Sequence, residues 1–160
     1  DLSGKTVTLP TGVGGKVLKV QHSEITASSS RVTATSYADD LDFGSFTPST
    51  SNSTILIQGV ANFDGDYTRY VYYKWVIDGS DYLSTGSTPD GGQVFYSSTS
   101  LNDLGYVPCP IVTSVDNTDG SAITVVCQGK VNAGTLWVNR SKQASSSGSP
   151  SSVLFMEVAN

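Results

Sequence analysis

The sequence predicts an all-β protein, built as a sandwich or barrel of antiparallel strands. About ten short segments have strand patterns, and turn signals separate them roughly every eight to twelve residues. Helical periodicity is nearly absent, because Gly, Pro or a β-branched run interrupts every long apolar window. The length of 160 residues fits one domain. We therefore expect an antiparallel β-sandwich with almost no helix.

The first expected strand, at residues 5–9, is separated from the rest of the chain by the glycine-rich segment Gly12–Gly15. Residues 1–15 are therefore expected to be a linker or a first strand that leads into the domain. The β-sandwich domain itself is expected to cover residues 16–160.

The next expected strands lie at residues 16–25 and 31–38, where apolar and polar residues alternate. A turn-rich loop at 47–53 follows. The strand at 54–63 contains the continuous run Ile55-Leu56-Ile57. A short continuous apolar run is typical of a strand buried on both faces.

The segment Thr68–Asp78 has the strongest strand pattern in the chain, because aromatic and β-branched residues dominate it. We expect its alternate side chains to fill the core, namely Val71, Tyr73, Trp75 and Ile77. The orientation of Tyr70 and Tyr72 stays open. Asp78-Gly79 is a hairpin signal, and Tyr82-Leu83 is expected to start the return strand.

Further strands are expected in the C-terminal half, at residues 93–96, 111–115, 122–131, 135–139 and 153–158. The last of these is apolar on both faces. A segment of this kind would form an aggregation-prone edge if it were exposed. We therefore expect it to lie inside the fold.

The charge of the chain argues against nucleic-acid binding. The net charge is -5, and charged residues make up 14% of the chain, against about 25% in an average soluble domain. The three arginines, Arg31, Arg69 and Arg140, are scattered, so nothing resembles a phosphate-binding cluster. No apolar run has the length needed to span a bilayer, and we expect no membrane partner.

Two cysteines, Cys109 and Cys127, lie in apolar, strand-like segments. They are too few for a disulfide framework, and their spacing does not match a metal site. Two buried free thiols and a single disulfide both remain open.

The sequence offers no arrangement that predicts catalysis. His22 is the single histidine, and no nucleophile-elbow pattern accompanies it. The aspartates 39, 40 and 42, and the pair 64 and 66, occur in turn-like contexts, where Asp commonly caps the local backbone. They do not match an EF-hand loop. We expect a non-enzymatic domain without a metal ion or cofactor.

Carbohydrate binding is the function that the side chains favour. Sugars are recognised by aromatic faces together with short polar groups. We expect any such site on exposed loops, which can carry function without unpairing strands. The likeliest loops are residues 64–67, 79–82, 89–93 and 101–106. The candidate receptor-binding residues are Asp64, Asp66, Tyr67, Asp81, Tyr82 and Asn102.

Four segments, in order along the chain, resemble a family of C-terminal domains in phage tail fibres and related virion proteins. These segments are Gly14–Val20, Thr54–Ile57, Gly134–Ser141 and Ser152–Ala159. The last two, with the sequences GTLWVNRS and SVLFMEVA, are the most distinctive. Cys109, Cys127 and the aromatic strand at Tyr70–Trp75 are not landmarks of that family.

The resemblance implies a jelly-roll-like β-sandwich that forms a homotrimer at the tip of a fibre and carries no catalytic residues. The implied place is the virion, outside the host cell. The partners would be two further copies of the chain and a host-surface glycan or protein. The alternative is a purely structural domain, either a trimerisation cap or a capsid decoration.

Overall fold

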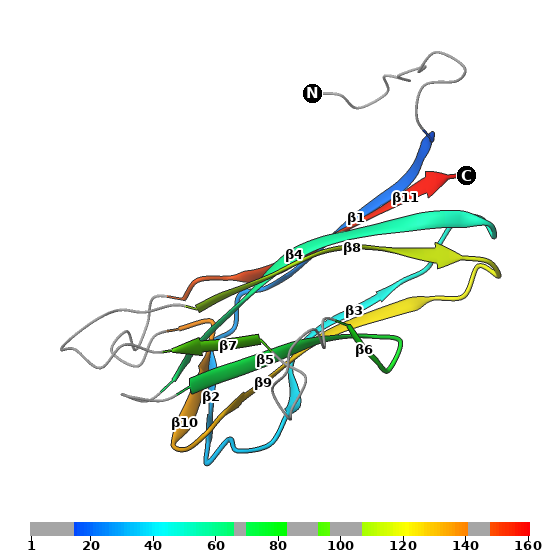
Figure 1. Cartoon of the computed structure of the whole chain (residues 1–160). Helices are drawn as coiled ribbons and strands as arrows, with labels where there is room; N and C mark the ends of the chain where they lie inside the picture. Colours follow the sequence, from blue (N-terminus) through cyan, green and yellow to red (C-terminus); the bar gives the residue numbers. More distant parts are fainter. Residues whose placement is uncertain (1–14, 66–69, 83–92, 97–106, 141–147) are drawn as a thin grey trace.

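The computed structural model describes residues 15–65, 70–82, 93–96, 107–140 and 148–160. Strands make up 72% of these residues, and no helix occurs among them. The strands form two antiparallel sheets that enclose one core, which is the arrangement of a β-sandwich (Figure 1). The predicted all-β class and antiparallel pairing are confirmed. Within the described part of the chain, no helix has the length and apolar character needed to cross a membrane.

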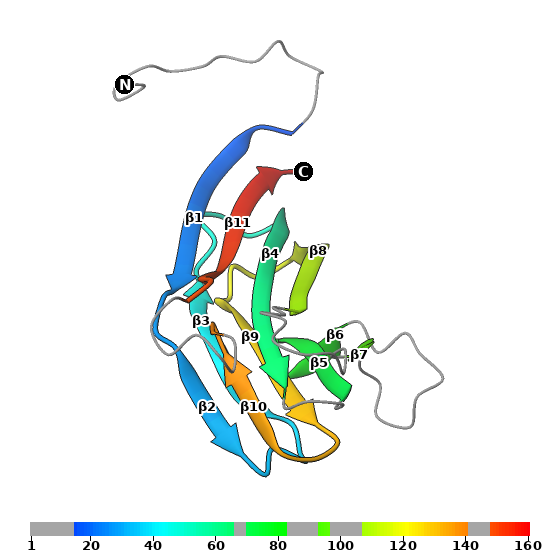
Figure 2. The same cartoon turned by 90° about the vertical axis from the view of Figure 1, so that its left-hand side faces the viewer.

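The first sheet has six strands arranged around the long strand β4. Their order is β1-β11-β4-β10-β2, and β8 pairs with the other side of β4. One side of β4 is shared, because β11 pairs with Ser53–Val60 and β10 with Phe63–Gly65 (Figure 2). The bounds are β1 (Val17–Ile25), β2 (Ser29–Val32), β4 (Ser53–Gly65), β8 (Val107–Asn117), β10 (Thr135–Val138) and β11 (Ser151–Ala159).

The second sheet has five strands in the order β3-β9-β5-β6, and β7 also pairs with β5. Their bounds are β3 (Ala38–Phe46), β5 (Tyr70–Ile77), β6 (Ser80–Tyr82), β7 (Gln93–Tyr96) and β9 (Ile123–Val131). Asp78 and Gly79 both have positive φ and join β5 to β6, as the hairpin signal predicted.

The core forms where the inward residues of both sheets meet. On β5 the predicted inward set is confirmed, because Val71, Tyr73, Trp75 and Ile77 are all buried. Phe46 of the second sheet stacks on Phe155 of the first, with ring centroids 5.3 Å apart. Contacts of this kind join the two sheets into one apolar core.

The C-terminal strand lies inside the fold, as predicted. β11 is hydrogen-bonded on one side to β1 and on the other to β4. Val153 and Phe155 face the core and are fully buried. Gly59 of β4 permits this close pairing, because a Cβ atom there would lie 2.5 Å from the Ser152 carbonyl oxygen.

Strand β3 was not predicted, and the aspartates that appeared to mark a turn, Asp39, Asp40 and Asp42, lie within it. The register between β3 and β9 shifts twice, after Asp39 and after Asp42. These irregularities break the two-residue alternation by which a strand is recognised in a sequence. Likewise, residues 31–38 were expected to be one strand, but residues 31–32 end β2, Ala38 begins β3, and residues 33–37 belong to no strand, with Thr33 at a positive φ of 55°.

Polar side chains of β1 close one side of the sandwich. Lys19, Gln21 and Ser23 donate hydrogen bonds to the carbonyl oxygens of Thr47, Ser45 and Phe43, respectively. The edge of β3 is thereby covered by side chains from the facing sheet. Covering a strand edge in this way limits pairing with other chains.

Candidate functional site

The predicted receptor-binding residues do not come together in the described structure. Asp64 lies in β4 and is only 4% exposed, so it does not sit on an exposed loop. Tyr82 is half-buried on β6, where its hydroxyl is hydrogen-bonded to Thr113 of β8. Asp66, Tyr67 and Asn102 lie outside the described residues, as do the loop segments 89–92 and 101–106.

Among the predicted binding residues that the structure describes, Asp81 is exposed and lies near aromatic rings. Its carboxylate accepts a hydrogen bond from the Lys74 amine at 2.7 Å. Lys74 and Tyr72 are alternate residues of β5, on the opposite face to the buried Tyr73 and Trp75. This outer face of the second sheet is the candidate site.

Four side chains on this face form a tyrosine–lysine cluster, namely Tyr37, Tyr72, Lys74 and Lys130. The Lys130 amine lies 4.7 Å from the ring centroid of Tyr37 and 5.0 Å from that of Tyr72. The Lys74 amine lies 5.1 Å from the same Tyr37 ring. Ammonium groups at these distances are attracted by the negative ring face.

Strand pairing fixes the positions of this cluster. Tyr72 of β5 is directly opposite Lys130 of β9, and Lys74 is opposite Gln128. Gln128 in turn donates to the carboxylate of Asp39 on β3 at 2.6 Å. Three neighbouring strands of one sheet, β5, β9 and β3, therefore carry Tyr72, Lys130 and Asp39 on this face.

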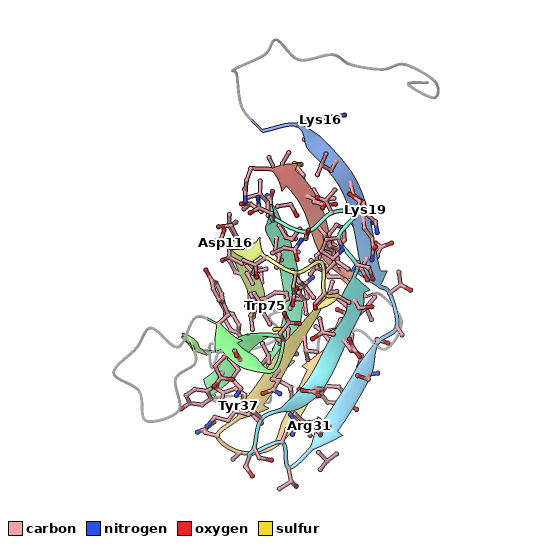
Figure 3. All side chains as sticks on the ribbon, turned by 90° about the vertical axis from the view of Figure 1, so that its right-hand side faces the viewer. Lys16, Lys19, Arg31, Tyr37, Trp75 and Asp116 are labelled. Atoms are coloured by element: carbon pink, nitrogen blue, oxygen red, sulfur yellow. The ribbon has the colours of Figure 1, made fainter. Side chains whose placement is uncertain are left out.

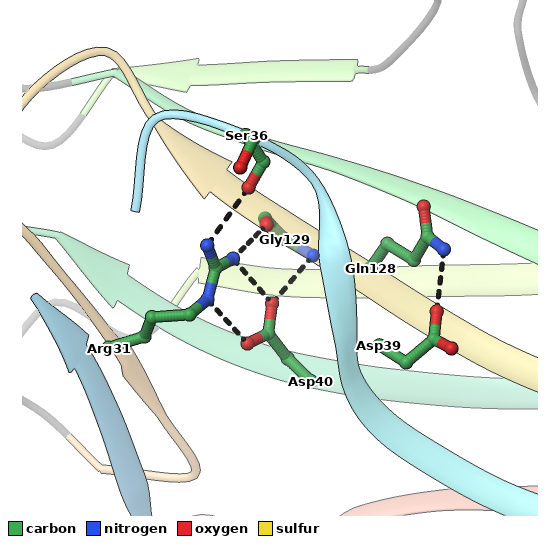
Figure 4. A network of polar contacts seen from close by, with 6 residues as sticks. All are labelled: Arg31, Ser36, Asp39, Asp40, Gln128 and Gly129. Carbon is green, nitrogen blue, oxygen red and sulfur yellow. Dashed lines mark hydrogen bonds and ion pairs between the residues drawn. The ribbon is translucent and has the colours of Figure 1, made fainter. Parts of the chain in front are cut away.

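Tyr37 precedes β3, and a hydrogen-bond network holds the segment that contains it (Figure 4). Arg31 of β2 makes two parallel contacts with the Asp40 carboxylate, at 3.1 and 3.0 Å. The same guanidinium donates to the carbonyl oxygens of Ser36 and Gly129. Tyr37 lies at the same end of the molecule as Arg31, away from the end that carries Lys16 (Figure 3). Arg31 thus anchors the residue next to Tyr37 with the planar, bidentate geometry that favours arginine.

Sequence reasoning missed Tyr37, Lys74 and Lys130 because they come from three separate segments. The available signal was the alternation of β5: once Tyr73 and Trp75 are assigned to the core, Tyr72 and Lys74 must face outward. The proximity of Lys130 and Tyr37 depends on strand order, which the alternation does not reveal.

Two residues of the distinctive C-terminal segments have structural roles. Glu157 is fully buried, and its carboxylate accepts hydrogen bonds from the backbone N–H and hydroxyl groups of Ser49 and Thr50 and from the Ser53 hydroxyl. Burial opposes its ionisation, but the hydrogen bonds outweigh this effect and lower the pKa of Glu157 to about 2. The carboxylate therefore binds the 47–53 loop to β11.

Asn139 has a comparable role at the end of β10. It has a positive φ of 55° and is fully buried. Its side-chain amide donates to the carbonyl oxygens of Ile25 and Ala27, and its side-chain oxygen accepts from Ser151. Asn139 therefore connects the ends of β1, β10 and β11.

The remaining chemically reactive groups show no catalytic arrangement among the described residues. His22 is exposed on the outer side of β1. No group of three or more His, Cys, Asp or Glu side chains that could hold a metal ion occurs in the described ranges.

Cys109 and Cys127 are free and buried. Burial raises the pKa of each thiol and, together with the two nearby thiols, that of Tyr73.

The fold and this surface define a two-sheet, all-β protein with partly buried tyrosine and lysine side chains on the outer face of its second sheet. No protein-family model matches the sequence, and no curated protein sequence matches it.

Proposed function

We propose that this chain is a non-enzymatic attachment domain of a phage virion appendage of the tail-fibre type. In this proposal the domain is a jelly-roll-like homotrimer that binds a glycan or protein on the host surface. It acts outside the host cell, at the tip of a fibre or of another appendage.

The segments that resemble fibre domains support this proposal through their structural roles. Glu157 and Asn139, which lie in the two most distinctive segments, each join parts of the chain that are distant in sequence. Residues that hold a fold together in this way are expected in common among proteins of one architecture. Their roles are therefore consistent with the resemblance to fibre domains. They do not themselves define a binding site, because both are buried.

The observation that carries the attachment function is the tyrosine–lysine cluster. Tyr72 of β5 and Tyr37, which precedes β3, are partly exposed tyrosines whose rings lie next to the lysine amines. This combination suits sugar recognition, in which a ring stacks on the apolar face of the sugar while polar groups bind its substituents.

A second candidate function is a purely structural role, as a trimerisation cap or capsid decoration. The observation that favours it is a group of apolar side chains on the outer face of the first sheet, which they share with His22, Gln58 and Ser114. The apolar residues are Val20, Leu56, Val60, Val112, Leu154 and Met156. Leu56 and Val112 are 42% and 77% exposed. Contiguous exposed apolar surface commonly marks a protein interface.

A glycan array and a cell-binding assay with the 160-residue chain distinguish the two candidates. The attachment function predicts binding to at least one glycan class or to cells of some strains in a bacterial panel. It also predicts that Tyr37→Ala and Tyr72→Ala reduce this binding while the circular dichroism spectrum stays unchanged. A folded chain that binds no glycan and no cells supports the structural role.

A further inference from the structure

The outer face of the first sheet is four strands wide at the level of the C-terminal strand. These strands lie in the order β1-β11-β4-β8, and each runs antiparallel to the next (Figure 2). Paired residues form level rows across all four strands. Two neighbouring rows on the outer face are Val20-Met156-Leu56-Ser114 and His22-Leu154-Gln58-Val112. Five of these eight side chains are apolar, and those of Val20, Leu56 and Val112 are exposed.

The two border strands of this face, β1 and β8, have no strand partner on their outer sides within the described part of the chain. Pro108 and Pro110 protect the beginning of β8, because proline lacks the N–H group that a further strand would bond. The rest of β8, from Ile111 to Asn117, contains no proline. An unprotected strand edge beside exposed apolar side chains favours association with another chain.

A second copy of this chain fits against these edges. Because β1 and β8 run in opposite directions, rotation about an axis parallel to the strands places β1 of one copy antiparallel to β8 of the next. Two copies stacked face to face would cover the apolar side chains but would leave both edges open. A closed ring covers the apolar side chains and both edges.

The width of the face fits a ring of three copies. Neighbouring strands lie about 4.8 Å apart, so four strands are about 19 Å wide. In an equilateral triangle with sides of about 19 Å, each side lies about 5.5 Å from the three-fold axis. This distance is close to half of the roughly 10 Å that separates two packed sheets, so side chains of ordinary length fill the centre.

We infer that three copies pack the outer faces of their first sheets around a three-fold axis, as the sides of a triangular prism. Met156, Leu56 and Leu154 of the two inner strands, β11 and β4, then point towards the axis. Gln58 lies among them, and its amide both donates and accepts, so the three copies of Gln58 can bond one another. This inference rests on the homotrimer of the proposed function and names the surface through which its copies bind.

Engineered disulfides across the corners of the prism test this arrangement. Rotation about the axis keeps the rows level, so His22 of one copy lies beside Val112 of the next. Within one copy these residues are three strand spacings apart, about 14 Å, which exceeds the roughly 7 Å between Cα atoms that a disulfide can span. The double variant His22→Cys with Val112→Cys, treated with oxidised glutathione at micromolar concentration, should therefore form a covalent trimer on a non-reducing gel. Val20→Cys with Ser114→Cys probes the neighbouring row and should give the same product.

Matched variants assign the cross-link to the prism. His22→Cys with Val32→Cys introduces thiols of comparable exposure, because Val32 is 75% exposed and Val112 is 77% exposed. Val32 lies on β2, outside the four-strand face, so this variant should give no covalent trimer. Each single variant, His22→Cys or Val112→Cys, should also stay monomeric on the gel, because unlike strands meet at each corner. The wild-type chain is the blank for Cys109 and Cys127, which are buried.

Light scattering and the cell-binding assay separate the possible failures. A trimeric wild-type mass without cross-linking of either double variant overturns the prism and leaves the homotrimer. Covalent dimers from a single variant indicate a two-fold arrangement and overturn the inference. A monomeric wild-type chain overturns the inference together with the homotrimer. Attachment is decided separately, because the same protein either binds cells or does not, whatever its mass.

Discussion

At the scale of single residues, the polar groups of this protein that are buried most deeply stabilise the fold. Glu157 is the clearest case, because five donor groups from a loop about 100 residues earlier in the chain converge on its carboxylate. A buried charge is tolerated only where hydrogen bonds replace its lost hydration. The Ser/Thr-rich composition of this loop, which looked like an ordinary turn, supplies those donors.

Glu157 should make the stability of the fold depend on pH. Its pKa is about 2 in the folded protein, against an ordinary value of 4.5. The unfolded chain therefore binds the proton first, and the contribution of Glu157 is present above about pH 4.5 and is lost as the pH falls towards 2. Glu157→Gln should cost about 1–3 kcal/mol at pH 7 and should lose this part of the pH dependence.

Urea unfolding at several pH values between 7 and 2 measures this effect. Glu24→Gln is the matched control, because Glu24 is exposed on β1 and should change stability little. If the Glu157→Gln variant lost stability on acidification as steeply as the wild type, the role of this carboxylate would be refuted.

The two thiols should be unreactive in the folded protein. Cys109 and Cys127 are both fully buried, and burial raises the pKa of each, so little reactive thiolate forms. A thiol reagent such as Ellman's reagent should detect almost no cysteine in the native protein. It should detect two per chain in guanidinium chloride without reductant. Rapid reaction of the native chain, or no reaction after denaturation, would contradict free, buried thiols.

At the scale of the elements, β11 does the most to hold the first sheet together. It lies between β1 and β4 and pairs with both over most of its length. Its inward residues reach the second sheet through the stack of Phe155 on Phe46. Without β11, β1 would lose its only strand partner among the described residues.

Phe155→Ala should therefore destabilise the fold by about 3–5 kcal/mol, as expected when a large buried aromatic side chain is removed. Leu154→Ala is the matched control on the outer face of the same strand, where the side chain is only half-buried. Its cost should be clearly smaller. Urea unfolding curves of both variants provide the measurement.

Truncation after Ser152 should abolish folding, because it removes most of β11. Circular dichroism and solubility test this expectation. A truncated chain that remained soluble, with an intact β spectrum and a cooperative thermal transition, would show that β11 is dispensable.

At the scale of the whole molecule, the proposed homotrimer needs a surface on which copies meet. The apolar outer face of the first sheet is the candidate. Exposed Lys16 directly precedes β1, which itself carries exposed Glu24, and exposed Asp116 lies on β8 (Figure 3). In a three-fold ring each copy presents one side to the next, so the β1 side of one copy would meet the β8 side of its neighbour.

Light scattering at micromolar concentration should therefore give a mass three times that of the 16.8 kDa chain. The double variant Leu56→Glu with Val112→Glu should be folded and monomeric, because it places charges in the proposed interface. Val32→Glu is the matched control: Val32 is 75% exposed, against 77% for Val112, but lies on β2 at the far end of the sheet (Figure 2). A monomeric wild-type chain contradicts the trimer, and a trimeric double variant contradicts this interface.

The sequence by itself determined the all-β class, most strands, the inward residues of β5 and the internal position of β11. These features follow from local alternation and apolar runs, which depend only on neighbouring residues. Strand β3 was not predicted, because its register irregularities interrupt the alternation of apolar and polar residues. The predicted binding residues could not be tested in this way against local patterns. A binding surface depends on which exposed side chains lie close together in space, and local alternation does not show this.

Only the tertiary structure decided the candidate site and the buried polar contacts. Tyr37, Tyr72 and Lys130 belong to separate segments, and the strand order β3-β9-β5 brings them to one face. Glu157 and its loop are likewise joined by the pairing of β11 with β4. The physical reason is that alternation determines which side of a strand faces inward, whereas strand order depends on how all strands share one core.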